Sequence, residues 1–243
     1  MEVRVNGASF AVIMRTPGAD RDLAAGFLLA EDVIRSADEI GAIETCDDVT
    51  DEGRDNTLNV TVTGEAVARL ATRLGERRQV MMTASCGLCG RRTIESLQAR
   101  VASVHGGWTV SAEVIASLPA RLRAAQVVFE STGGLHAAGL FDLKGTLQLS
   151  AEDVGRHNAV DKISGRMLLA GRHPLETSML LVSGRTSFEL VQKALLAGVP
   201  LIAAVSAPSS LAIDLAQKAN ITLCGFVRGP DFNVYSHPSR ITS

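Results

Sequence analysis

Hydrophobic and polar residues alternate at the start of the chain, and this alternation predicts a β-hairpin. Val3 and Val5 are separated by polar residues, and the alternation resumes from Phe10 to Met14. Between the two runs, Asn6-Gly7 has the composition of a tight turn, because both residues accept the positive φ angles that such turns require. We therefore expect two antiparallel strands here.

Two helices, a loop and a strand are expected after the hairpin in the first part of the chain. Apolar residues at helical spacing predict a helix that begins at Asp20 and carries Ile34 on its buried face, and the polar residues 47–56 predict a loop. Alternation over residues 58–62 predicts a strand, and a second helix should follow Gly64. Its expected inward-facing positions are Val67, Leu70 and Leu74. Residues 1–80 are therefore expected to form a small α+β domain.

Strands and helices alternate in the last part of the chain. Helical segments up to about Glu130 are followed by a second hairpin over residues 135–150. The expected helices then span residues 154–169, 187–197 and 210–219, and the expected strands span residues 179–182, 201–205 and 221–226. Strands that are apolar on both faces need helices on both sides of the sheet. We expect an α/β domain over residues 111–243, joined to the first domain by a cysteine-containing loop and a linking helix over residues 81–110.

The composition narrows the classes of protein that this chain could be. Hydrophobic residues make up 46% of the 243 residues, charged residues 21%, and the net charge is -2. These values exclude a disordered chain and give no general attraction to nucleic acid or to an anionic membrane. The sequence contains no apolar run of the ~18 residues that a spanning helix needs, and no signal-peptide pattern. We expect a cytoplasmic protein without nucleic-acid or membrane partners.

The four cysteines point to one functional pair. Cys86 and Cys89 form a Cys-x-x-Cys motif, whereas Cys46 and Cys224 stand in apolar, strand-like surroundings that predict inert core thiols. Cys86 comes just before a predicted helix, and two arginines follow Cys89. A helix N-terminus and nearby positive charge both lower the pKa of a thiol, so Cys86 is the candidate nucleophile.

A thiolate in this position is able to accept sulfur as a persulfide, but two other kinds of chemistry stay open. A structural zinc site would need two further ligands, and the sequence offers no second cysteine pair. We therefore expect no bound metal. A thioredoxin-like dithiol pair is the other alternative.

Polar segments that follow predicted strands supply candidate ligand-binding residues. Arg156 and His157 lie in the first turn of a predicted helix, with Glu152-Asp153 expected at the helix start, where their charges suit the helix dipole. Two serine-rich loops follow neighbouring strands, at the edge where open α/β sheets bind ligands. Their candidate residues are Ser183, Gly184, Arg185 and Ser206. Each segment alone would also be consistent with an ordinary solvated helix start.

A segment near the C-terminus could cover a purine ring. It contains the single tyrosine of the chain together with a histidine and a rigid proline, although a tail that merely packs on the domain would have the same composition. Its candidate residues are Phe232, Asn233, Val234, Tyr235, Ser236 and His237. A lone histidine at position 136 is expected to be a buried core residue.

Five segments together resemble the formate dehydrogenase accessory sulfurtransferases of the FdhD/NarQ family. They are Ser85–Gly90, Thr132–Ala138, Glu152–Lys162, Ser183–Lys193 and Ser206–Ala212. Residues 16–27 resemble the N-terminal part of the same family, so the likeness covers nearly the whole chain. Because the chain begins close to its first strand, a leader present in longer relatives is expected to lie outside it.

The resemblance implies both a fold and an activity. The fold would be a small N-terminal domain joined to a cytidine-deaminase-like, three-layer α/β/α domain with a mixed sheet. The activity would be transfer of sulfur from a cysteine desulfurase, as a persulfide on Cys86 with Cys89 as its partner, to the molybdenum cofactor of formate dehydrogenase. That cofactor, bis-molybdopterin guanine dinucleotide, would be bound as a client by a homodimer, with residues 232–237 as the C-terminal part of the site.

Three rival functions follow from the same observations. A zinc deaminase is excluded, because its His-x-Glu and Pro-Cys-x-x-Cys motifs are replaced by Arg156-His157 and Thr186-Ser187. A chaperone that binds the cofactor without transferring sulfur, and a zinc- or redox-dependent regulator, both remain open. The two serine loops, the Arg156-His157 turn and residues 232–237 are expected to converge on one ligand site, because successive strands of one sheet deliver their following loops to the same edge.

Overall fold

The computed structural model describes residues 1–46, 56–77 and 103–243, and the first two ranges form one small unit. Its four-stranded sheet has the order β2-β1-β4-β3. The strands are β1 (Glu2–Val5), β2 (Ala8–Val12), β3 (Ile40–Thr45) and β4 (Thr57–Val62), and the helices are α1 (Asp20–Ala30), η1 (Ala37–Glu39) and α3 (Glu65–Arg77). β1 pairs parallel with β4, so the chain crosses over the sheet through α1 between them.

The predicted hairpin is confirmed, and its turn has the expected geometry. Asn6 and Gly7 both have positive φ, 50° and 81°. Two positive φ angles in succession match the twist of the strands that they join. The Asn6 side chain also accepts a hydrogen bond of 2.9 Å from the Val62 N–H, which ties the hairpin to β4.

Three details of this unit differ from the prediction. Strand β3 was not expected. Helix α1 ends at Ala30, because Asp32 adopts a positive φ of 54° that stops the helix. Ile34 is nevertheless buried, as expected. Val67 of α3 is 46% exposed. Leu70 is buried and Leu74 packs against the core of the unit, both as expected, but Ala66, one position before Val67, is buried in its place.

Residues 103–243 form an α/β domain around a six-stranded mixed sheet of order β11-β10-β9-β8-β6-β7. The strands are β6 (His136–Phe141), β7 (Leu147–Asp153), β8 (Met179–Val182), β9 (Leu201–Ala204), β10 (Thr222–Gly225) and β11 (Asn233–Ser236). The helices are α5 (Ala112–Ala124), α6 (Val127–Thr132), α7 (Arg156–Leu169), α8 (Phe188–Leu196), α9 (Ser210–Lys218) and η2 (Pro238–Arg240). The short strands β5 (Val110–Ser111) and β12 (Ile241–Thr242) pair with each other.

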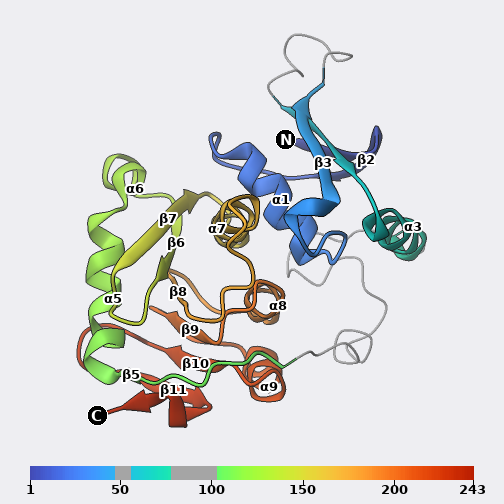
Figure 1. Cartoon of the computed structure of the whole chain (residues 1–243). Coiled ribbons are helices and arrows are strands. Elements are labelled where there is room, and N and C mark those ends of the chain that lie inside the picture. The colour runs from blue at the N-terminus through green and yellow to red at the C-terminus, as the bar shows by residue number, and fades with distance from the viewer. Residues whose placement is uncertain (47–55, 78–102) are drawn as a thin grey trace.

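Helices cover both faces of this sheet, so the expected three-layer α/β/α arrangement with a mixed sheet is confirmed (Figure 1). On one face, α5 packs on a core that includes Ile115, Leu118 and Phe141. On the other face, α7, α8 and α9 pack on a second core that includes Val160 and Val191. The strands are apolar on both sides because both sides are buried.

The small unit is held to the α/β domain by a close crossing of α1 and α7. A Cβ atom at Gly26 of α1 would lie 1.9 Å from the backbone oxygen of Asp161, and one at Gly165 of α7 would lie 1.9 Å from that of Asp22. Only glycine permits such an approach. Leu168 of α7 belongs to the core of the small unit, so the two parts share apolar contacts as well.

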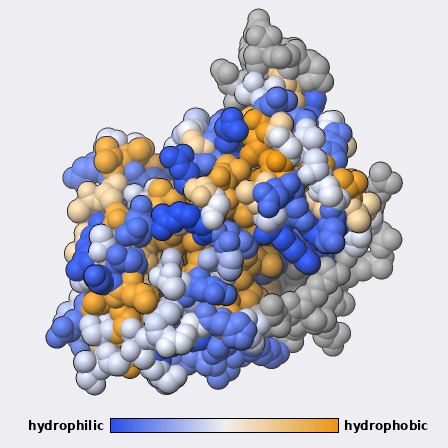
Figure 2. Space-filling view, in the orientation of Figure 1, coloured by the Kyte–Doolittle hydropathy of each residue, from blue (hydrophilic) through white to orange (hydrophobic). Residues whose placement is uncertain are grey.

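The surface in Figure 2 carries apolar areas over α6 and over the small unit, interrupted by hydrophilic side chains. Val127 and Val128 of α6 are 76% and 41% exposed. Within the described ranges, no helix combines the length and the apolar character needed to cross a membrane. Of the helix expected before His105, residues 94–102 lie outside the described part. Val104 is not helical, and its N–H donates to the Ala219 oxygen at 3.1 Å.

Candidate functional site

One edge of the six-stranded sheet collects the predicted ligand-binding loops. β8, β9 and β10 are parallel, so the segments that follow them all leave from this edge. β6 begins at the same edge, since Ala138 pairs with Val182, and β7 ends there, since Asp153 pairs with His136. We call this edge, with residues 153–157, 183–187, 205–209 and 226–228 and with His136, the strand-end row.

The serine loops lie side by side in the strand-end row, as predicted. The Thr186 N–H donates to the Ala207 oxygen at 3.1 Å, and the Ser209 N–H donates to the Thr186 oxygen at 2.9 Å. Ser183 turns its hydroxyl to the start of β6, where it accepts from the Ala137 N–H at 2.9 Å. Arg185 is exposed.

The Arg156-His157 turn adjoins the first of these loops. A Cβ at Gly184 would lie 3.4 Å from His136 Nδ1 and 3.7 Å from Arg156 Cδ, so these three residues meet. His157 Nε2 lies 3.1 Å from Ser187 Oγ and 3.4 Å from a carboxylate oxygen of Glu189. The sequence brought His157 into the site but assigned His136 to the core, and His136 is only partly buried.

The C-terminal segment reaches the row at one end only. β11 runs antiparallel to β10, with Asn233 opposite Gly225 at the row and Ser236 opposite Leu223 near the other edge of the sheet. Ser236 is buried and donates to the Ile221 oxygen at 2.7 Å, and His237 Nε2 contacts the Gln217 oxygen at 2.9 Å. The prediction that the whole segment converges on the row is therefore wrong for Ser236 and His237.

The other residues of that segment divide between the two faces of the sheet. A Cβ at Gly225 would lie 2.9 Å from the Tyr235 ring and 2.9 Å from Pro208, which places Tyr235 beside the second serine loop. Phe232 packs against the core under α5 instead. Val234, which lies between Phe232 and Tyr235 in the sequence, has a side chain that is 38% exposed.

Most of the segment Glu152–Lys162 holds the fold rather than facing the row. Glu152 and Asp153 end β7 instead of starting α7, which corrects the prediction. The Glu152 carboxylate accepts from the N–H groups of Val128 and Phe129 at 2.8 and 2.7 Å and so caps α6.

The buried Asp153 ties α7 to the residues that precede α1. It forms an ion pair of 2.7 Å with Lys162 and accepts from the Thr16 N–H at 3.1 Å. Lys162 donates to the Thr16 oxygen at 2.9 Å, and Asn158 donates to the Met14 oxygen at 2.7 Å. Arg156 and His157 are the two side chains of the segment that this scaffold presents to the row.

Behind the row lies a buried cluster of charged groups. Lys193 Nζ contacts both carboxylate oxygens of Asp161 at 2.9 Å and a carboxylate oxygen of Glu189 at 3.7 Å. Burial alone would lower the pKa of Lys193, but the two carboxylates outweigh it and raise that pKa, so Lys193 stays charged. Burial also raises the pKa of Glu189.

His157 is neutral in this environment. Burial, reinforced by the charges of Lys193 and Arg156, lowers its pKa from 6.5 to about 3. Burial, followed by the charge of Arg156, lowers the pKa of His136 as well. The sequence missed Glu189 and Lys193, although their spacing of four residues on the helix after Ser187 was a usable signal.

Three buried side-chain atoms in the described ranges lack a hydrogen-bond partner, and all three lie at this place. They are Arg156 Nε, Thr186 Oγ1 and Glu189 Oε2, the last of which has only the 3.4 Å contact with His157 Nε2 described above. A buried polar group without a partner costs about 1–3 kcal/mol. Their concentration at the starts of α7 and α8 indicates a region arranged to receive polar groups from outside the chain.

The cysteine predictions divide between described and undescribed residues. Cys86 and Cys89 lie outside the described ranges. Cys46 and Cys224 are buried, as predicted, and burial raises the pKa of the Cys224 thiol to about 12. No group of His, Cys, Asp and Glu in residues 1–46, 56–77 and 103–243 is placed to hold a metal ion, and the expectation of no bound zinc stays a prediction.

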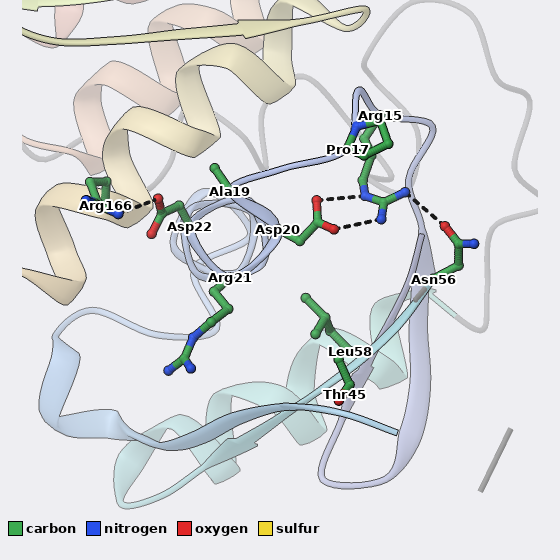
Figure 3. A pocket seen from close by; sticks show the side chains of 10 residues that line it. All are labelled: Arg15, Pro17, Ala19, Asp20, Arg21, Asp22, Thr45, Asn56, Leu58 and Arg166. Atoms are coloured by element: carbon green, nitrogen blue, oxygen red, sulfur yellow. Dashed lines mark hydrogen bonds and ion pairs between the residues drawn. The ribbon is translucent and has the colours of Figure 1, made fainter. Parts of the chain in front are cut away.

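A separate pocket of about 770 Å³ lies at the start of α1 (Figure 3). Its charged walls are largely paired with one another. Arg15 bonds both carboxylate oxygens of Asp20 at 2.8 and 2.7 Å and Asn56 at 3.0 Å, and Arg166 lies 3.4 Å from Asp22. These internal pairs hold the start of α1 against β4 and α7.

Comparisons with known proteins give matches to one family over nearly the whole chain. The model of the FdhD/NarQ family matches residues 1–242. The chain is 48% identical to the sulfur carrier protein FdhD of Nocardia farcinica over 100% of its own length and 86% of the relative. It is 49% identical to the protein of the same name from Streptomyces avermitilis over 99% of its length and 86% of the relative.

A solved structure shows the same fold. The crystal structure of a putative formate dehydrogenase accessory protein from Desulfotalea psychrophila superposes with a TM-score of 0.76 at 26% identity. The match covers 99% of this chain and 87% of that one.

Proposed function

Because this chain belongs to the FdhD/NarQ family, we propose that it is a sulfur carrier for the maturation of formate dehydrogenase, with Cys86 as the residue that holds the sulfur. The names of its relatives support the first part. One observation on the structure supports the second part: Cys46 and Cys224 are buried, and the Cys224 thiol, with a pKa near 12, is almost never ionised at neutral pH.

Sulfur would enter and leave through exchange at Cys86. The Cys86 thiolate attacks the outer sulfur of a persulfide on a cysteine desulfurase; one S–S bond breaks, another forms, and the donor cysteine leaves as a thiolate. Attack by the Cys89 thiolate on the Cys86 sulfur would then release the outer atom as sulfide. Oxidation of the two cysteine sulfurs to the Cys86–Cys89 disulfide supplies the two electrons that reduce the outer sulfur to sulfide, and a dithiol reductant of the cell then returns the pair to thiols for the next round.

The acceptor in this proposal is the molybdenum cofactor, bis-molybdopterin guanine dinucleotide, bound as a client at the strand-end row. The three unpartnered polar atoms there support a ligand site. Arg156 and the exposed Arg185 supply positive charge for a pyrophosphate, and the starts of α8 and α9 supply N–H donors. The sequence alone pointed to the same loops.

Sulfur loading is tested by intact-protein mass after incubation with a cysteine desulfurase and cysteine. The wild-type chain should gain one sulfur atom that dithiothreitol removes, and Cys86→Ala should not. Cys224→Ala is the matched control and should load as the wild type does. Loading that survives in Cys86→Ala would overturn the assignment, and cofactor binding without any loading would favour the chaperone alternative.

Ligand binding is tested by calorimetry with GDP, which carries the guanine base and the pyrophosphate of the cofactor. Arg185→Ala should weaken GDP binding by about 1.5–3 kcal/mol if Arg185 makes a charge-assisted hydrogen bond to phosphate. ADP, which has the same diphosphate but an adenine base, is the control that shows whether the site distinguishes guanine. Equal and weak binding of both nucleotides, unchanged in Arg185→Ala, would remove the strand-end row from the proposal.

The remaining parts of the proposal are the partners and the location. The sulfur donor is a cysteine desulfurase, the client is a formate dehydrogenase, and the working form is a homodimer. A thiol pair that must stay reduced between rounds of transfer suits the cytoplasm. Co-purification with a desulfurase tests the sulfur donor, and mass photometry tests the homodimer.

A further inference from the structure

A strained aromatic residue stands at one end of the strand-end row. Phe226 follows β10 directly and has a φ of 56°, in the left-handed region that a bulky side chain rarely adopts. The neighbouring backbone holds it there: the Phe226 N–H donates to the Ser206 oxygen at 3.3 Å, while the Val227 N–H donates to the Ala204 oxygen at 3.0 Å. This local irregularity resembles the bulges that redirect side chains near functional sites.

The strain does not serve to bury the ring. Phe226 is 38% exposed, whereas Val227 next to it is fully buried in the core under α5. A strained residue with an exposed aromatic ring indicates a function that requires the ring in this place.

The surroundings of the ring suit a planar, electron-rich group. The guanidinium carbon of Arg228 lies 5.7 Å from the centre of the Phe226 ring, and Arg228 is fixed by a hydrogen bond of 2.9 Å to the Val205 oxygen. Aromatic rings and guanidinium planes are the usual stacking partners of nucleic-acid bases. Through its backbone N–H, Phe226 adjoins the loop that contains Ser206 and Pro208, and Tyr235 lies beside the same loop.

We propose that Phe226, with Arg228 beside it, is the stacking surface for the planar base of the ligand bound at the strand-end row. The inference rests on the proposed function, because it takes a nucleotide-like ligand as given. β10 and β8 are two strands apart, about 10 Å. A ligand with its base on Phe226 therefore has its phosphates near the loop after β8, where Gly184, Arg185 and Arg156 lie. This place differs from the segment 232–237, which the sequence indicated as the cover for a purine ring.

The test compares GDP with inorganic pyrophosphate in calorimetry. In Phe226→Asn, which removes the ring and tolerates a positive φ, GDP binding should weaken at least tenfold while pyrophosphate binding stays within twofold of the wild type. Phe226→Tyr should keep GDP binding within twofold. Phe129→Asn is the matched control, because Phe129 also lies under an arginine, with the Arg123 guanidinium carbon 4.6 Å from its ring centre, but on α6.

The outcomes separate this inference from the proposed function. If the wild type binds neither probe, the ligand site itself is wrong, and the role of Phe226 falls with it. If the wild type prefers GDP to pyrophosphate at least tenfold and Phe226→Asn keeps that preference, the site stands and Phe226 is not its stacking surface. Unchanged pyrophosphate binding also shows that the variant is folded.

Discussion

The crossing of α1 and α7 should make Gly26 and Gly165 intolerant of even one added methyl group. An alanine Cβ at either position would lie 1.9 Å from a backbone oxygen of the other helix, against 3.4 Å or more in ordinary contacts. The helices would have to separate by about 1.5 Å, and a gap of 0.5–1 Å already removes roughly a quarter to a half of the dispersion energy of each contact. Both partner atoms are backbone oxygens, so rotation of a side chain is not able to relieve the clash, and the helices themselves have to move.

We expect Gly26→Ala to lower the free energy of unfolding by about 3 kcal/mol, at the upper end of the usual range for overpacking. For a chain of this length, that corresponds to a fall in Tm of roughly 6–12 °C. Thermal and urea unfolding followed by circular dichroism measure both quantities. Gly165→Ala should lower the free energy of unfolding by a similar amount. The double variant should lower it by clearly less than the sum of the two single variants, because one separation of the helices relieves both clashes.

Gly75→Ala is the matched control for this prediction. Gly75 lies in α3, and a Cβ there would meet nothing within 4 Å. Alanine has the higher helix propensity, so this substitution should stabilise the protein by about 0.5–1 kcal/mol. A Gly26→Ala protein whose Tm lies within a degree or so of the wild type would show that the two helices are not packed as closely as described.

Three further expectations follow from the buried groups. Lys193→Met should cost about 3–5 kcal/mol, because it leaves Asp161 buried without its partner, and adding Asp161→Asn should restore part of the loss in urea unfolding. The pKa of His157 is about 3 in the folded chain and near 6.5 in the unfolded one, so the unfolded chain takes up a proton first as the pH falls. The free energy of unfolding should then decrease by up to about 1.4 kcal/mol per pH unit below pH 6.5, a slope that His157→Gln should flatten. In a variant that lacks the cysteine pair, Cys224 should react with thiol reagents at pH 8 only after denaturation, and rapid labelling of the native protein would contradict its raised pKa.

The hydrophobic pattern was enough to predict the α/β domain, because its strands are buried on both faces and its helices are regular. β8, for example, has the predicted bounds. β3 was missed because its residues, such as Gly41 and Glu44, give little alternation, and its pairing with β4 is made by the backbone. Tertiary pairing of this kind leaves no periodic signal in a single sequence.

The candidate site was predicted in part, for a similar reason. Loops that follow parallel strands must meet at one edge, so the serine loops were placed correctly from their order alone. The antiparallel direction of β11 was not readable from the sequence, and it carries His237 away from that edge. The strained backbone of Phe226 depends on hydrogen bonds to the preceding strand and its loop, which no local pattern encodes.

The contacts between α7 and the first residues of the chain have an evolutionary consequence. A shortened gene that encoded only residues 103–243 would produce an α7 with Leu168 exposed and with Lys162 deprived of its bond to Thr16. Most domains have a hydrophobic core of their own and could in principle fold alone. The α/β domain of this chain should instead be inherited together with the small unit. In a fusion protein that replaces residues 1–30, the first compensating substitutions should supply new apolar and hydrogen-bonding partners for α7.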